Sequence, residues 1–345
     1  MKSLAVRYRP NTFEEVCGNQ VTVKILKRVL ELNKPKNAYL FAGPSGCGKT
    51  TCARIFANNL NGGCGDPVEI DAASNNGVDQ VRALVESASQ RSLTGTYKIY
   101  IIDECHAITS AGWQAFLKGI EETPEYTIFI FCTTEPNKIP ATILNRVQRF
   151  NISKIDSNEI KDRLVHICKQ EGFTNYDETC DLISKLSNGG MREAITKLDQ
   201  CADLSTDLSL ENSKLVLGEA PFERMLKLTN CLIGGNEQFT LAAIETLDKE
   251  GRDLKQFIDD YLSFVLELTK YILFKNISVT TIPSYLEKHE DNMISVSYTT
   301  SFENALGWFN TLTNKLLEIK SMIKYDTSVK SVIEAYLLQV CRKHY

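Results

Sequence analysis

A glycine-rich stretch near the start of the chain ends in a lysine and a threonine and reads GPSGCGKT. It matches the pattern G-x-x-x-x-G-K-[S/T], in which glycines let backbone N–H groups point at a phosphate without an obstructing Cβ. In such a loop Lys49 would neutralise the β- and γ-phosphates, and the Thr50 hydroxyl would coordinate Mg²⁺. The candidate nucleotide-binding residues here are Gly43, Pro44, Ser45, Gly46, Cys47, Gly48, Lys49, Thr50 and Thr51.

Two adjacent carboxylates, Asp103 and Glu104, end a run of apolar residues. Because paired acids at the end of a buried strand are costly without a cation opposite, they indicate a functional site. We expect Asp103 to hold Mg²⁺ together with Thr50, and Glu104 to orient and polarise the attacking water. Thr134 ends another apolar run, where its hydroxyl is expected to hydrogen-bond the γ-phosphate or that water.

Strands alternating with helices must position these residues. Apolar runs predict strands at 39–42, 68–71, 98–104, 127–134 and 147–152, with helices at 21–32, after the glycine loop, from 78, at 113–122 and at 139–146. This alternation predicts a doubly wound parallel sheet whose strand ends open at a ligand crevice. Before it, Pro10 and Gly18 favour an extended arm, which either lies on the surface or covers the nucleotide base.

Helical periodicity dominates from about Asp156 to the end of the chain, with breaks at glycine pairs. We therefore predict three domains, at 1–155 for nucleotide binding, 156–217 for a helical lid and 218–345 for a helical collar. The apolar stripes of the last part form either a core or a subunit interface.

The composition fits a globular protein, with 345 residues of which 43% are hydrophobic and 24% charged. A net charge of −4 argues against wrapping nucleic acid by bulk charge, although a local basic patch is compatible with it. No apolar segment is long enough for a membrane span and the N-terminus lacks a signal-peptide core, so we expect a cytoplasmic protein without membrane partners. The eleven cysteines include no C-x-x-C pair, which predicts buried thiols and no zinc site.

Taken together, these features resemble the AAA+ ATPases, and among them the bacterial clamp-loader ATPase subunits of the DNA polymerase III gamma/tau family. The resemblance covers about the first 200 residues through several independent motifs. The motifs are Tyr8-Arg9-Pro10-x-x-Phe13, Gly43 to Thr50, Glu69-Ile70-Asp71-Ala72-Ala73-Ser74-Asn75-Asn76-Gly77, Ile102-Asp103-Glu104-x-His106, Leu117-Lys118-x-x-Glu121-Glu122-x-Pro124, Thr133-Thr134-x-Pro136-x-Lys138-x-Pro140 and Ile143-Leu144-x-Arg146.

The resemblance implies a role for each matching position. Lys49 and Thr50 would be Walker A, Asp103 and Glu104 Walker B, Thr134 sensor 1, Arg192 sensor 2, and Tyr8, Arg9 and Pro10 the arm at the nucleotide. Arg146 would be an arginine finger that reaches the ATP of a neighbouring subunit, with Lys118 acting across the same interface. The family uses ATP and Mg²⁺ to open a sliding clamp and place it on primer–template DNA.

The resemblance also implies partners. The chain would assemble with other loader subunits into a pentamer through its collar, and would bind the clamp. It would contact DNA through Arg82, Asn75 and Asn76.

Three departures from the family pattern stand out. The finger lies in Asn145-Arg146-Val147 where the family has Ser-Arg-Cys, and the family's four-cysteine zinc module is reduced to a segment with Cys64 alone. Because the sequence ends at Tyr345, we also expect the family's long C-terminal tail to be absent. A short form of viral or of divergent bacterial origin, in the bacterial cytoplasm or that of an infected host, is compatible with these departures. Two alternatives stay open: another AAA+ DNA-processing machine, such as a Holliday-junction motor, and a mainly structural loader subunit with weak turnover.

Overall fold

The computed structural model describes residues 2–64, 66–91, 95–122, 124–217, 221–274, 280–282, 302–324 and 328–341. The chain divides into two compact units, the first formed by Met1–Phe173 with Leu186–Asp203 and the second by Thr174–Lys185 with Leu204–Tyr345. The domain limits predicted at 155 and 217 remain predictions, and the predicted start of the collar at Gly218 lies outside the described residues.

A five-stranded parallel sheet forms the centre of the first unit, in the order β2-β3-β4-β1-β5. The strands are β1 (Ala38–Ala42), β2 (Val68–Asp71), β3 (Lys98–Asp103), β4 (Thr127–Thr133) and β5 (Gln148–Asn151). This confirms the predicted parallel α/β fold. Because β3, β4 and β1 are neighbours, their carboxyl ends bring together the residues that follow each strand.

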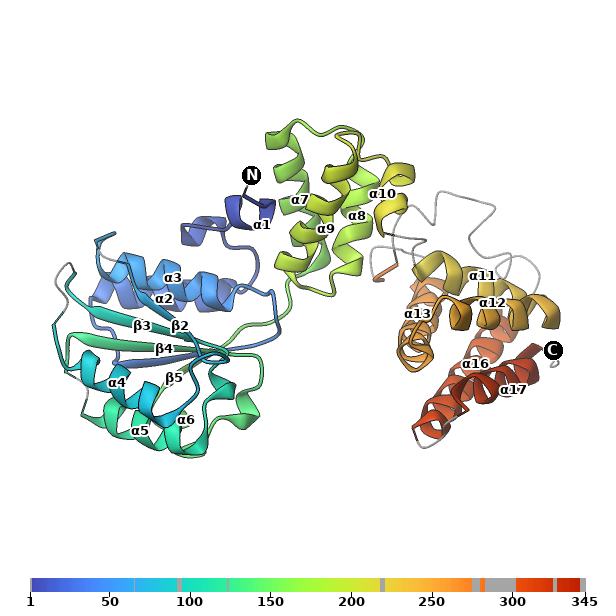
Figure 1. Ribbon diagram of the computed structural model, residues 1–345. Coiled ribbons are helices and arrows are strands. Elements are labelled where there is room, and N and C mark those ends of the chain that lie inside the picture. The colour runs from blue at the N-terminus through green and yellow to red at the C-terminus, as the bar shows by residue number, and fades with distance from the viewer. Residues whose placement is uncertain are drawn as a thin grey trace. The chain divides into compact units, whose positions relative to one another are not determined.

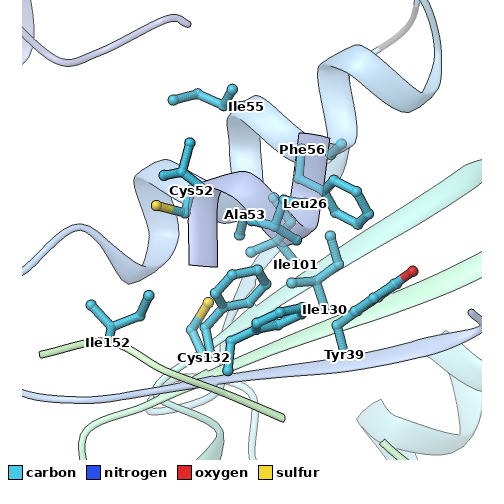
Figure 2. Close-up of a cluster of buried hydrophobic side chains, with 14 of the residues drawn as sticks. Leu26, Tyr39, Cys52, Ala53, Ile55, Phe56, Ile101, Ile130, Cys132 and Ile152 are labelled. Atoms are coloured by element: carbon cyan, nitrogen blue, oxygen red, sulfur yellow. The ribbon is translucent and has the colours of Figure 1, made fainter. Parts of the chain in front are cut away.

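Helices cover both faces of the sheet, with α2 (Gln20–Leu32) and α3 (Lys49–Leu60) on one side and α4 (Val78–Ala88) and α5 (Ser110–Glu121) on the other (Figure 1). Alternate strand residues point to opposite faces, so a strand buried on both sides is apolar throughout. Tyr39, Ile130 and Cys132 pack under α2 and α3 (Figure 2), whereas Leu40 and Phe131 pack under α4 and α5.

Short elements fill the connections of this unit. They are α1 (Leu4–Arg7), the 3₁₀ turns η1 (Phe13–Glu15), η2 (Cys105–Ala107) and η3 (Pro136–Lys138), and the helix α6 (Ala141–Leu144). The extended arm predicted before α2 is therefore wrong in its first part. Leu4 is only 1% exposed, and the backbone N–H groups of Val6 and Arg7 donate to the Ser3 carbonyl at 3.0 Å, so that burial stabilises one helical turn ahead of Pro10.

The remaining elements are helical, as predicted. In the first unit, α7 (Ser157–Glu171) and nearly all of α9 (Met191–Leu204) follow the sheet. The second unit contains α8 (Asp177–Leu186) without its last residue, α10 (Leu210–Leu217), α11 (Pro221–Ile233), α12 (Glu237–Lys249), α13 (Leu254–Phe274), α16 (Phe302–Ile323) and α17 (Val329–Cys341). In its core the Tyr261 hydroxyl lies 3.0 Å from the Thr229 hydroxyl, which satisfies both buried groups.

Most of the cysteines are buried, as predicted, and all eleven are free thiols. Cys17 and Cys231 are half-buried, and Cys64 is exposed, so the prediction of buried thiols is wrong for Cys64. It lies between α3 and β2, where residues 61–66 are otherwise glycine, asparagine and aspartate. Within the described ranges, no helix combines the length and apolarity needed to cross a membrane.

Candidate functional site

The glycine loop connects the end of β1 to the start of α3. Gly46 and Gly48 have φ of 73° and 97°, a left-handed conformation that glycine adopts without a steric penalty. The backbone N–H groups of residues 45–48 donate to no carbonyl or side chain in the described part of the chain. Together with the N-terminus of the 12-residue helix α3, they form a cradle that fits a phosphate group.

Gly43 is required for a different reason, the close approach of the chain after β5. An alanine Cβ at this position would lie 2.0 Å from the Ile152 carbonyl oxygen. Gly43→Ala is therefore expected to destabilise the protein by about 3 kcal/mol or more, at the upper end of overpacking effects. Equilibrium unfolding in urea measures this loss.

Gly77→Ala is the matched control, because the nearest neighbours of an added Cβ there belong to the Gln80 side chain, at 3.3 Å and beyond. We expect a change of less than about 1 kcal/mol for this variant. Equal unfolding free energies for the two alanine variants would contradict the close approach at Gly43.

Lys49 and Thr50, the first two residues of α3, form hydrogen bonds at the carboxyl ends of β1 and β3. Lys49 is only 6% exposed, and its ammonium donates to the carbonyl oxygens of Gly43 at 3.0 Å and Pro44 at 2.9 Å. The Thr50 hydroxyl donates to Oδ2 of Asp103 at 2.7 Å. A hydroxyl and a carboxylate in contact beside a phosphate cradle are oxygen donors that suit Mg²⁺.

Glu104 follows Asp103 in a left-handed backbone conformation, with φ of 46°. Its backbone N–H donates to Oδ1 of Asp103 at 3.0 Å, and its side-chain Oε2 accepts from the Thr134 hydroxyl at 3.3 Å. Non-glycine residues in this conformation are uncommon and occur often at functional sites. The structure thus brings Thr134, predicted near the γ-phosphate, into contact with Glu104.

A cleft of about 750 Å³ lies over these residues within the first unit. It is lined by the predicted site residues Tyr8, Arg9, Pro10, Ser45, Gly46, Cys47, Gly48, Lys49, Thr50, Thr51, Asp103, Glu104 and Arg192, and also by Arg54 and Arg163, which the sequence analysis did not single out. Arg54 and Arg163 belong to no motif, so their sequence positions do not indicate that they line the cleft.

Arginines concentrate positive charge around this cleft. The Arg9 guanidinium donates through Nε to the Thr51 hydroxyl at 3.3 Å, and the Arg192 backbone N–H donates to the Gly46 carbonyl at 3.3 Å. Burial lowers the pKa of Arg9, and the nearby charge of Arg54 acts in the same direction. The surroundings therefore favour an anionic ligand.

The arm is fastened to α7 by a carboxylate that the sequence analysis missed. Arg7 donates to both oxygens of Glu171, at 2.9 and 2.8 Å, and the Tyr8 hydroxyl donates to the same carboxylate. Arg163 adds a bond of 3.0 Å to the Tyr8 carbonyl. The hydrogen bond from Arg7 is the main cause that lowers the pKa of Glu171.

Arg146 and Lys118 lie away from this cleft. Arg146 is exposed, donates to the Thr142 carbonyl at 2.8 Å and forms an ion pair of 2.6 Å with Glu121 at the end of α5. Lys118 is exposed one helical turn before Glu121 on the same helix. The structure thus groups the two candidate interface cations near α5 and does not bring them to the nucleotide residues of their own chain.

The predicted DNA-contacting residues are also outside the cleft, and all three are exposed. Arg82 on α4 pairs with Asp79 at 3.5 Å. Asn75 and Asn76 precede α4, where the Asn75 amide donates to the Asp71 carbonyl at 3.0 Å. No group of three or more metal-ligating side chains occurs in the part of the chain that the structure describes.

Comparison with solved structures identifies the fold. The Thermotoga maritima RuvB Holliday junction branch migration motor is similar with a TM-score of 0.52, at 21% identity over 65% of this chain and 79% of that one. A variant of the same protein aligns with a TM-score of 0.53 at 20% identity, over 72% of this chain and 86% of that one. At this level of identity the likeness concerns the fold alone.

Comparison with curated proteins gives closer similarity. The chain is 36% identical to DNA polymerase III subunit tau of Bacillus subtilis, over 76% of this chain and 51% of that protein. It is 33% identical to DNA polymerase III subunit gamma/tau of Mycoplasma genitalium, over 79% of this chain and 50% of that protein. It is 30% identical to DNA polymerase III subunit tau of Escherichia coli, over 76% of this chain and 44% of that protein.

The chain thus spans about half the length of these relatives. A family model described as DNA polymerase III, delta subunit, matches residues 61–156. Over the part that aligns, these similarities support membership of the clamp-loader family that contains the DNA polymerase III gamma/tau subunits.

Proposed function

We propose that this chain is an ATPase subunit of a sliding-clamp loader, which binds and hydrolyses ATP at subunit interfaces to open a clamp and place it on primer–template DNA. The observation that carries the proposal is the meeting of Lys49, the Thr50–Asp103 pair and Glu104 at one cleft. The similarity to gamma/tau subunits supports the choice of substrate and partners. The site of action would be the bacterial cytoplasm.

Each residue of the cleft would have a distinct role in binding or hydrolysis. Lys49 and the N–H groups of the loop bind the phosphates, while Thr50 and Asp103 hold Mg²⁺. Mg²⁺, when bound, supplies positive charge that offsets the charge developing on the phosphates. Glu104 orients and polarises a water molecule, and Arg192 adds positive charge at the lid side of the cleft. The proposal includes no zinc, because Cys64 stands alone between α3 and β2.

Arg146 would complete the site of a neighbouring subunit. Its exposure and its absence from the lining of the cleft support a role in trans, with Lys118 at the same interface. Hydrolysis would then be fast only when neighbours are correctly assembled. We propose a pentamer held by the helical collar, with the clamp as a further partner.

DNA contact would come from a few groups on each subunit. Arg82, Asn75 and Asn76 are exposed around the N-terminal end of α4, where a phosphate can be met by a side chain or by backbone N–H groups. Several subunits would share the DNA backbone, which makes this mode compatible with the net charge of −4.

The stimulation of ATP hydrolysis by substrates tests the proposed function. We expect primer–template DNA together with the clamp to raise the turnover of the assembled complex at least about tenfold, which corresponds to about 1.4 kcal/mol of barrier. The measurement is steady-state phosphate release with DNA, with clamp, with both and with neither.

A four-way DNA junction serves as the comparison substrate in the same assay. Stimulation by the junction but not by the clamp would favour another AAA+ DNA-processing machine. Turnover that is indifferent to every addition would refute the loader proposal, and weak turnover with normal clamp loading would favour a mainly structural subunit.

A further inference from the structure

His106, in the 3₁₀ turn η2 that follows Glu104, lies between two acidic side chains. Its Nδ1 is 3.3 Å from Oε2 of Glu104, and its Nε2 is 3.4 Å from Oε1 of Glu135, which follows β4. Nδ1 is also 3.2 Å from the Thr133 hydroxyl. The imidazole therefore links the residue after β3 to the residues at the end of β4.

The polar contacts of His106 go beyond the packing of an apolar ring. The His106 side chain is 19% exposed, and each of its nitrogens faces a polar partner. A carboxylate oxygen accepts hydrogen bonds, so whichever ring nitrogen carries a proton can donate to the carboxylate that it faces. The ring is itself held in place, because Glu135 is fixed by Lys138 at 2.9 Å and its backbone N–H donates to the Thr133 hydroxyl at 3.0 Å.

The contacts of Glu104 are one-sided. His106 and Thr134 both approach Oε2, at 3.3 Å each, whereas no described residue forms a hydrogen bond or an ion pair with Oε1. Glu104 lines the cleft, so Oε1 is the oxygen left to accept a proton from water or to orient it. The hydrogen bond from Thr134 and the close approach of the imidazole to the same oxygen restrict the rotation of the Glu104 carboxylate.

We propose that His106 is a positioning residue for ATP hydrolysis, which holds Oε2 of Glu104 so that Oε1 faces the attacking water, with Glu135 supporting the ring from the opposite side. This inference rests on the proposed role of Glu104. In this role the imidazole itself would touch neither the nucleotide nor the attacking water. Its loss should therefore lower the rate of hydrolysis without weakening the binding of ATP.

The test compares His106→Phe, which keeps a ring but removes both nitrogens, with His106→Asn, which returns a donor close to the position of Nδ1. In the assembled complex we expect His106→Phe to lower kcat about 10- to 100-fold, the cost of a misplacement of about 1 Å, with KM and the affinity for a fluorescent ATP analogue unchanged. His106→Asn should recover most of the loss. His166→Phe, at an exposed position of α7, is the matched control and should leave kcat unchanged.

Two further variants separate the possible outcomes. Glu135→Ala removes a half-exposed side chain and should lower kcat about threefold with KM unchanged. It therefore tests the inference even if His106→Phe fails to fold. Unchanged kcat in either variant, a higher KM, or no recovery in His106→Asn would overturn the inference. Glu104→Gln tests the proposed role of Glu104, on which the inference rests. Normal turnover in that variant would refute this role. Lost turnover in Glu104→Gln together with normal turnover in His106→Phe would refute the inference alone.

Discussion

Replacing Lys49 by alanine is expected to lower kcat/KM for ATP hydrolysis by about 10³-fold or more, with a matching loss of nucleotide binding. The ammonium is almost fully buried and lies at the end of β1, with donors already directed at the loop. Charge-assisted hydrogen bonds in such a site are stronger than those in water. Removing one donor to a developing anion typically lowers the rate by about 10²–10³-fold. Equilibrium titration with a fluorescent ATP analogue and steady-state hydrolysis measure the two effects.

The control for this variant is Lys24→Ala, which removes an exposed lysine from α2. It should bind and hydrolyse ATP normally. Thermal unfolding of both variants checks that the fold is kept, since Lys49→Ala also leaves two loop carbonyls without their donor. Hydrolysis at the normal rate by a folded Lys49→Ala protein would exclude the glycine loop from the site.

The local motifs could be predicted because their geometry depends on consecutive residues. The glycine loop is set by the eight residues from Gly43 to Thr50, and the Asp103–Glu104 pair by the apolar strand before it. That Thr50 and Asp103 meet, although 53 residues apart, follows from the rule that parallel strands open their carboxyl ends on one side of the sheet. A few motifs and one topological rule were therefore sufficient for the centre of the site.

The second layer around this centre could not be predicted. Glu171 is one acidic residue among many on an amphipathic helix, and only the fold brings it to Arg7 and Tyr8, more than 160 positions earlier. His106 has a plain motif position, but its role depends on Glu135, which follows another strand. Such contacts join segments whose relative placement is fixed by packing, and a single sequence carries no signal for the pairing.

Tertiary contacts also explain why the extended arm was wrongly predicted for the first residues. A four-residue helix is unfavourable on its own, because nucleation costs more than one turn returns. Here the buried Leu4 side chain and the hydrogen bond of 3.1 Å from its N–H to Asp199 on α9 stabilise the turn. The conformation of the first residues is therefore set by tertiary contacts, which Pro10 and Gly18 do not indicate.

Arg146 illustrates how a departure from a family motif can be supported by other contacts. The residues on either side are Asn145 and Val147, yet the guanidinium is oriented by the Thr142 carbonyl and by Glu121. With the two side chains 39% and 48% exposed, an ion pair of this kind contributes only about 0–1 kcal/mol. It can therefore orient the guanidinium and still release it to a stronger anion, such as a phosphate at a subunit interface.

Arg146→Ala is expected to bind ATP normally and to lose about 10³- to 10⁵-fold in turnover, but only in the assembled complex. The guanidinium does not line the cleft of its own chain, so binding to the isolated subunit has no reason to change. In the assembly it would stabilise charge on the transferring phosphate, which affects kcat and leaves the dissociation constant unchanged. Single-turnover hydrolysis and nucleotide titration, on the subunit and on the complex, give the four quantities needed.

Arg149→Ala is the matched control, because Arg149 is also exposed and lies three residues further along the chain. Its side chain donates to Oδ1 of Asn151 at 2.8 Å. It should hydrolyse ATP normally in both states. Weakened ATP binding by the isolated Arg146→Ala subunit would mean that the guanidinium serves its own cleft. Normal turnover of the assembled variant would mean that the neighbouring site is completed by another group, and Lys118, one helical turn from Glu121, would then be the next residue to replace.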